Sequence, residues 1–175
     1  MMRQIRRRLL AGLALAFTFT VGTAVTPASA SDSPRVTNLH SGLCLEISGE
    51  SKANGARATQ WGCNDKVHQS WHFDQEFPAG LWRLVNNNSG KCLEIADWRQ
   101  DDGAPARQWD CTGGDNQLWY AIDYDDDGTS AEALVNVHSG KCLELGGWST
   151  AWGAGVSQWG CHRGGNQLWA GVPRW

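Results

Sequence analysis

The sequence predicts an all-β domain built from three copies of one unit. A Gln-x-Trp triplet recurs about 50 residues apart, six cysteines form three equally spaced pairs, and no stretch after the leader has a convincing helical period. A fixed period of this kind indicates one supersecondary element per copy, which buries its apolar face only against its siblings. The triplets are Gln69-Ser70-Trp71, Gln117-Leu118-Trp119 and Gln167-Leu168-Trp169.

Each unit contains four predicted strands. Near-alternating apolar residues mark the first strand at 36–39, 81–85 and 133–137. The second strand starts at Cys-Leu-Glu, where we expect Leu45, Leu93 and Leu143 to point inward. An Asn/Asp-Gly turn in the first two units, matched by Trp-Gly in the third, leads to a third strand that ends at Gln-Trp-x-Cys. The fourth begins near Gln-x-Trp, and surface loops at 74–80 and 122–132 join the units.

These motifs, repeated in register, resemble the ricin B-type lectin family of Gln-x-Trp carbohydrate-binding modules. The resemblance covers about residues 35–172 and implies a β-trefoil of three four-strand pseudo-repeats, at about 35–78, 79–126 and 127–175. Spacing alone does not distinguish a trefoil from a sandwich, so the trefoil is an implication of the resemblance. The all-β prediction comes from the residues themselves.

The first 30 residues read as a secretory signal peptide that precedes a single domain at 31–175. Four arginines form a basic head, an apolar stretch follows, and Ala28-Ser29-Ala30 is a small-residue cleavage site. The apolar stretch is short for a membrane span, so we expect a secreted, extracellular protein without a membrane anchor after cleavage.

Export predicts that the six cysteines are oxidised. Because each unit should close on itself, the repeat favours one disulfide per unit: Cys44–Cys63, Cys92–Cys111 and Cys142–Cys161. Zinc binding is the alternative, but the chain has no C-x-x-C pair.

Charge and motif content exclude several classes of function. Without the leader, 11 basic residues stand against 18 acidic ones, a net charge of −7, which is opposite to what a phosphate-binding surface needs. We therefore expect no nucleic-acid partner. No nucleophile elbow, metalloprotease motif or phosphate loop occurs, so we expect no enzyme, no cofactor and no metal site.

Two sets of tryptophans recur. Those of the Gln-x-Trp triplets are expected in the core, with the indole N–H bonded to the backbone. The other set lies two residues before a cysteine, where the family stacks a sugar ring on the apolar indole face; the alternative is that these rings only cover the disulfide. The second set is Trp61, Trp109 and Trp159.

Polar groups would orient a stacked sugar, because a carboxylate and an amide together satisfy both halves of its hydroxyl groups. The family places an Asp after Cys-Leu and an Asn before the Gln of Gln-x-Trp. The residues that match the amides here are His68-Gln69, Asn116-Gln117 and Asn166-Gln167. His68 replaces the usual amide, which makes the first unit the weakest candidate.

The acid departs from the family pattern in every unit, where Glu46, Glu94 and Glu144 stand in place of Asp. The extra methylene displaces the carboxylate, and such a shift can disrupt bidentate hydrogen bonding. Either the pockets take a different ligand or pose, or the glutamates have become structural.

Further features lie outside these motifs. Trp98 and Trp148 follow the first cysteine of their units by six residues, and they either wall the same pockets or are exposed loop rings. The segment 123–128 has D-x-D-x-D-G spacing, but Leu134 replaces the Glu of a calcium loop, so a solvated acidic turn is favoured over calcium binding.

The sequence therefore predicts a secreted, monomeric lectin-like module. The resemblance implies galactose-type or xylan-like glycans as partners, bound at up to three repeat-related sites. The alternative is a degenerate trefoil that serves as a protein-interaction or inhibitor scaffold without sugar binding.

Overall fold

The computed structural model describes residues 35–76, 80–124 and 130–173, which form twelve β-strands and six short 3₁₀ turns. The first repeat holds β1 (Thr37–Asn38), β2 (Cys44–Ile47), β3 (Ala58–Trp61) and β4 (Trp71–Glu76). The second holds β5 (Leu81–Asn86), β6 (Cys92–Ile95), β7 (Ala106–Trp109) and β8 (Trp119–Asp123). The third holds β9 (Ala131–Asn136), β10 (Cys142–Leu145), β11 (Val156–Trp159) and β12 (Leu168–Ala170).

Each repeat places one 3₁₀ turn after its second strand and another before its fourth. The turns are η1 (Ser48–Glu50), η2 (Val67–Gln69), η3 (Ala96–Trp98), η4 (Asp115–Gln117), η5 (Gly146–Trp148) and η6 (Gly165–Gln167). The four strands per repeat confirm the sequence prediction. β4 and β5 extend farther than expected, since residues 74–76 pair with Leu81, Trp82 and Arg83 in a hairpin instead of forming a loop.

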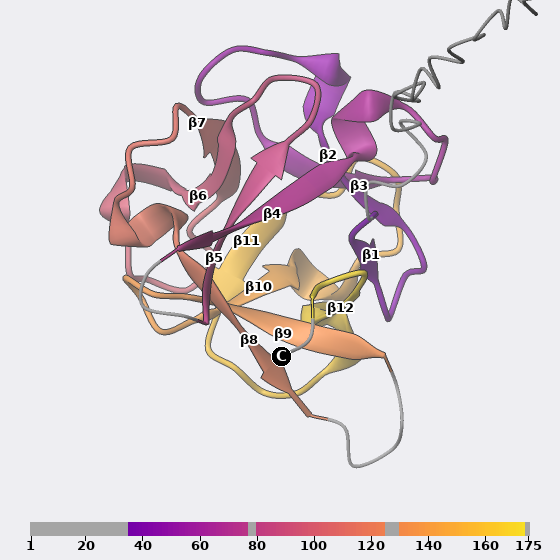
Figure 1. The fold of residues 1–175 in the computed structure, drawn as a ribbon. Helices are drawn as coiled ribbons and strands as arrows, with labels where there is room; N and C mark the ends of the chain where they lie inside the picture. The colour runs from indigo at the N-terminus through magenta and orange to yellow at the C-terminus, as the bar shows by residue number, and fades with distance from the viewer. Residues whose placement is uncertain (1–34, 77–79, 125–129, 174–175) are drawn as a thin grey trace, which may run out of the picture.

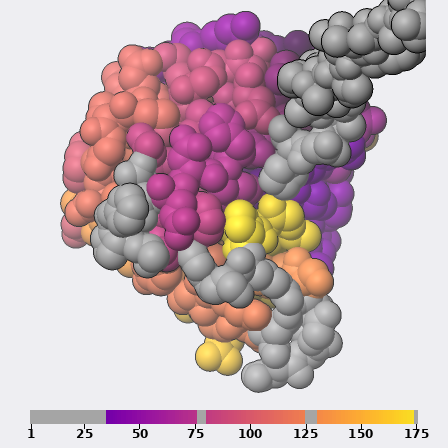
Figure 2. Space-filling view, in the orientation of Figure 1, coloured from indigo at the N-terminus to yellow at the C-terminus, as the bar shows by residue number. Residues whose placement is uncertain are grey.

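The strands form two parts, a barrel-like wall and a set of hairpins that caps it (Figure 1). Antiparallel pairing runs through β4, β5, β8, β9, β12 and β1, so that the last strand of the chain joins the first. The hairpins β2–β3, β6–β7 and β10–β11 meet one another through isolated bridges such as Thr59 with Gly155. This threefold wall and cap is the β-trefoil that the resemblance implied. Figure 2 shows the yellow C-terminal segment against atoms of both the first and third repeats.

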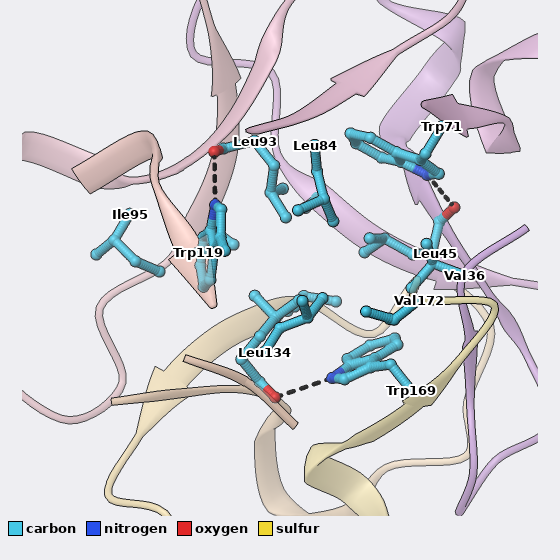
Figure 3. Packing of buried hydrophobic residues seen from close by; sticks show 14 of the residues in the cluster. Val36, Leu45, Trp71, Leu84, Leu93, Ile95, Trp119, Leu134, Trp169 and Val172 are labelled. Carbon is cyan, nitrogen blue, oxygen red and sulfur yellow. Dashed lines mark hydrogen bonds between the residues drawn. The ribbon is translucent and has the colours of Figure 1, made fainter. Parts of the chain in front are cut away.

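Three tryptophans lie in the core (Figure 3). Trp71, Trp119 and Trp169 are fully buried, and each indole N–H donates to the carbonyl of the Cys-Leu-Glu leucine at 3.0–3.1 Å. Those leucines are also fully buried. The predicted core positions are therefore confirmed, and each bond ties the last strand of a repeat to its second strand.

A second buried residue joins each repeat to the next. The Gln108 side chain is fully buried, and its Nε2 donates to the carbonyls of Ser51 and Ala53 at 2.9 and 3.0 Å, while its Oε1 accepts the Ser89 hydroxyl at 2.7 Å. Gln60 and Gln158 make equivalent contacts. Their amide nitrogens donate to carbonyls of the turns at residues 149–151 and 99–101, and their amide oxygens accept the hydroxyls of Ser41 and Ser139. The first repeat is thereby bonded to a turn of the third repeat, so that the three repeats form a closed ring.

Each repeat carries its own disulfide, as the repeat pattern predicted. Cys44–Cys63, Cys92–Cys111 and Cys142–Cys161 each close a loop of sequence separation 19, and the described residues contain no free cysteine. In the chain-entropy model such a loop stabilises the fold by about 3 kcal/mol. Each disulfide also anchors the segment that follows its third strand to the buried second strand.

The predicted leader at 1–30 lies outside the described residues. Within 35–76, 80–124 and 130–173, no helix has the length and apolar character needed to cross a membrane.

Gln108→Leu should destabilise the protein by about 2–4 kcal/mol, because two carbonyls and a hydroxyl lose their partner at a buried junction. Urea unfolding followed by tryptophan fluorescence measures this change. Gln100→Leu is the matched control, since Gln100 is exposed, and its effect should stay within about 0.5 kcal/mol. Equal effects of the two substitutions would contradict the junction role.

Candidate functional site

The Cys-Leu-Glu carboxylates are buried in all three repeats. Glu46, Glu94 and Glu144 are only 4–5% exposed. Because successive side chains of a strand point to opposite faces, the leucine before each glutamate enters the core, and the glutamate lies on the other face beside the residue paired with it on the third strand. A buried carboxylate is costly unless it is hydrogen-bonded, so its partners define the site.

The Gln-x-Trp glutamines hold these carboxylates. Gln117 Nε2 donates to Glu94 Oε2 and to the Asp110 carbonyl, both at 2.9 Å, and its Oε1 accepts the Thr112 N–H at 2.8 Å. Gln69 and Gln167 are bonded in the same way in their repeats. Both amide hydrogens are thus committed, which makes the glutamine a positioning residue that fixes the carboxylate and the loop after the disulfide.

The residue before each glutamine is the second partner of the carboxylate. Asn116 Nδ2 donates to Glu94 Oε2 at 3.3 Å and to the Ile95 carbonyl at 3.1 Å, and Asn166 does the same with Glu144 and Leu145. Since both partners are acceptors, the nitrogen must face them. The Oδ1 atoms of Asn116 and Asn166 are buried without a hydrogen-bond partner among the described residues.

His68 takes the place of this amide in the first repeat. Its Nε2 lies 3.2 Å from Glu46 Oε2, and both side chains are buried. Its Nδ1 is likewise buried without a partner among the described residues. The replacement that marked the first unit as weakest therefore preserves both the contact with the carboxylate and the unpaired atom.

An open pocket lies above each carboxylate. The pocket volumes are about 380, 280 and 240 Å³ in the first, second and third repeats. Each is walled by the tryptophan that ends the third strand, with Trp61 and Trp159 39% and 45% exposed and Trp109 half-buried. The structure thus brings together the predicted glutamate, tryptophan and Asn or His in every repeat, with the glutamine beneath them.

Each pocket tryptophan rests on a turn of the neighbouring repeat. A Cβ added at Gly153 would lie 3.4 Å from Cζ3 of Trp61, and Gly153 has a φ of +80°. Gly55 and Gly103 approach Trp109 and Trp159 in the same way. These turns are the ones held by the buried junction glutamines, so the ring of repeats also sets the position of each stacking surface.

Trp98 and Trp148 line the second and third pockets, as one of the two sequence hypotheses expected. The Trp98 ring packs over Gly114. The backbone carbonyl of Trp98 accepts a hydrogen bond from His138 Nε2 at 3.0 Å. Glu50 occupies this position in the first pocket, where a hydrogen bond and ion pair with Lys66 hold the pKa of the Glu50 carboxyl below its usual value.

The pockets differ most at the residue opposite the glutamate. Thr59 donates its hydroxyl to Glu46 Oε1 at 3.4 Å, Arg107 forms an ion pair with Glu94 Oε1 at 2.9 Å, and Ser157 stands opposite Glu144. Burial alone would lower the pKa of Arg107, but its hydrogen bonds to Glu94 and Asp97 outweigh this effect and raise it.

The family model for the ricin-type β-trefoil lectin domain matches the chain three times, at residues 17–109, 68–159 and 115–174. Together these matches span most of the sequence. The chain therefore belongs to the ricin-type β-trefoil lectin domain family.

Solved structures agree with this membership. The designed threefold-symmetric protein ThreeFoil is 34% identical, with a TM-score of 0.74 over 78% of this chain and 95% of its own. The exo-β-1,3-galactanase 1,3Gal43A from Clostridium thermocellum is 30% identical, with a TM-score of 0.74 over 79% of this chain but only 29% of its own. A Macrolepiota procera ricin B-like lectin, solved with lactose, shares the fold at 23% identity, with a TM-score of 0.67 over 83% of this chain and 97% of its own. No curated protein matches the chain by sequence.

Membership of this ricin-type lectin domain family points to a carbohydrate-binding domain. Within the described ranges, no group of three or more His, Cys, Asp or Glu side chains is arranged to hold a metal ion. The calcium hypothesis falls on residues 123–128, of which 125–128 lie outside the described part of the chain.

Sequence reasoning missed two features of these pockets and their surroundings. Arg107 lies two residues before Trp109, a spacing that places both side chains on the same face of β7, so strand register could have revealed it. Trp152 comes from the third repeat but packs beside Trp61 of the first, with ring centroids 5.2 Å apart. The contact between Trp152 and Trp61 depends on the closed ring of repeats, which no local pattern indicates.

A double-mutant cycle tests the positioning role of the glutamine. Gln167→Leu and Glu144→Leu should show a coupling energy of about 1–3 kcal/mol in urea unfolding, because removing the glutamine leaves a buried carboxylate without its main donor. Gln117→Leu combined with Glu144→Leu is the control from different repeats and should be additive within about 0.5 kcal/mol. A coupling energy near zero for the first pair would refute the assignment.

Proposed function

We propose that this protein is a secreted lectin that binds galactose-type or xylan-like glycans at its repeat-related pockets. One recurring arrangement carries the proposal: an exposed or half-exposed tryptophan stands beside a buried glutamate whose orientation is fixed by two neighbouring side chains. The arrangement recurs in all three repeats although other pocket residues differ.

The chemistry of a pyranose fits this arrangement. One face of the sugar ring presents C–H groups that pack on an indole, and its hydroxyl groups need both acceptors and donors. The glutamate supplies acceptor oxygens. The unpaired Oδ1 atoms of Asn116 and Asn166 offer further acceptors at the pocket floor, where a ligand hydroxyl would remove the cost of a buried unsatisfied group.

Secretion is supported by three observations. The leader at 1–30 has the order of a signal peptide, each repeat is closed by a disulfide, and the lectin fold is consistent with an extracellular protein. The proposed partners are glycans or polysaccharides, and the proposed protein is a monomer.

Weak single sites gain strength when several act together. Pockets of 240–380 Å³ with openly exposed rings bury little of a ligand, so each should bind weakly. Because the pockets are fixed on one rigid ring, a polymeric glycan that reaches two of them would bind with increased avidity.

A scaffold without sugar binding is the second candidate. It is favoured by the replacement of the family's aspartate with glutamate in every repeat, because each glutamate is satisfied by internal partners. The oxidised protein on a broad glycan and polysaccharide array separates the two candidates. Binding to one coherent sugar class, displaced by free sugar, supports the lectin, whereas a blank array from folded protein supports the scaffold.

Replacing Trp61 and Trp159 together with alanine should weaken glycan binding at least about tenfold, or ~1.4 kcal/mol, because both stacking surfaces are lost. Titration with a sugar selected by the array measures the change. Leu39→Ala, at another exposed apolar side chain, should leave the affinity unchanged. Unchanged affinity in the tryptophan variant would remove these rings from the binding site.

A further inference from the structure

A side chain of the protein itself covers the groups of the second pocket that would hold a sugar. Arg107 lines this pocket together with Glu94 and Trp109, which are the groups proposed to hold a sugar. The Arg107 side chain is only 20% exposed although it carries a charge. A long cation held this deeply in an otherwise open pocket indicates a fixed position.

Two contacts of Arg107 use groups that a sugar would need. Its Nε donates to Glu94 Oε1 at 2.9 Å, and its guanidinium carbon lies 4.6 Å from the ring centroid of Trp109. A third contact, from Nη2 to Asp97 Oδ1 at 2.9 Å, holds the far end of the side chain at the pocket rim. The guanidinium therefore covers the indole and engages the carboxylate at the same time.

A neutral sugar competes poorly with these contacts. The hydrogen bond between the guanidinium and the carboxylate joins opposite charges, which a neutral hydroxyl cannot do, and the cation is also attracted to the indole face. A hydroxyl that displaced Arg107 from Glu94 would leave the cation with only one of its two carboxylate partners, Asp97, in a partly buried pocket. The carboxylate and the indole of the second pocket are thus already engaged by an internal side chain, although about 280 Å³ of the pocket stays open beside it.

In the described part of the chain, no side chain both covers the tryptophan and bonds the glutamate of the first or third pocket as Arg107 does in the second. The equivalent positions hold Thr59 and Ser157, whose short side chains cannot reach over the tryptophan ring. In the third pocket His162 Nε2 lies 3.6 Å from Glu144 Oε2, but its ring stacks with Trp148 instead of covering Trp159. Trp61 and Trp159 remain more exposed than Trp109.

We propose that Arg107 closes the second pocket to sugar by engaging Glu94 and Trp109 as an internal ligand, so that the protein binds glycan only through its first and third pockets. This inference rests on the proposed lectin function and assigns its valency. It reverses the ranking that the sequence suggested, because the first unit keeps an open pocket despite His68 while the second unit is occupied despite its matching Asn116 and Gln117.

Indole N–H signals of the ¹⁵N-labelled, oxidised protein test the proposal site by site. Trp61, Trp109 and Trp159 each report one pocket during titration with lactose and with xylotriose. In the native protein the signals of Trp61 and Trp159 should shift while that of Trp109 stays fixed. In Arg107→Thr, which carries the residue of the first repeat, Trp109 should shift over the same concentration range as the others.

Two controls accompany this titration. Arg57→Thr removes an exposed arginine and should leave the native pattern unchanged. Arg107→Ser, with the residue of the third repeat, replaces Arg107→Thr if the threonine variant does not fold. A Trp109 signal that shifts in the native protein, or that stays fixed in the folded Arg107 variant while the other two respond, would overturn the proposal.

A measurement without sugar separates this inference from the lectin function. The ¹⁵N heteronuclear NOE of Arg107 Nε–H should match the backbone of β7 if the side chain is held in the pocket, and a value as low as that of Arg57 would overturn the closure. If neither sugar shifts any indole signal while the Arg107 NOE is high, the closure stands and the proposed binding of these two sugar classes fails.

Discussion

The buried glutamine before each pocket tryptophan is the contact on which the rest of the structure depends. A hydrophobic side chain could not replace the glutamine at these junctions between repeats, because each glutamine satisfies two carbonyls of a neighbouring turn. The three glutamines are Gln60, Gln108 and Gln158. One four-strand unit cannot bury its apolar face alone. The glutamines join the three units into a closed ring and so complete the main core around the three Gln-x-Trp tryptophans.

The same junctions build the pockets. A junction glutamine precedes each stacking tryptophan, so the turn that the glutamine holds is also the turn on which the ring rests. Beneath this surface, the Gln-x-Trp glutamine fixes the carboxylate of the second strand. The two repeated motifs therefore have distinct tasks: one sets the apolar wall of the pocket and the other sets its polar floor.

Repetition made much of this predictable from sequence. The twelve strands, the three disulfides and the core tryptophans follow from a pattern seen three times, because a constraint repeated in register is hard to satisfy in another way. The differences between repeats were harder to predict. Sequence comparison ranked the first unit by His68, whereas contacts across the hairpin, such as Arg107 with Glu94, and across the ring, such as Trp152 with Trp61, depend on the fold.

A crystal structure with a bound oligosaccharide tests the central claim most directly, because it locates the sugar without relying on any substitution. The account predicts a sugar ring on Trp61 and on Trp159, with a hydroxyl group bonded to Glu46 or Glu144. A sugar bound elsewhere on the surface, with these glutamates still bonded only to their internal partners, would contradict it and would make the repeated carboxylates purely structural.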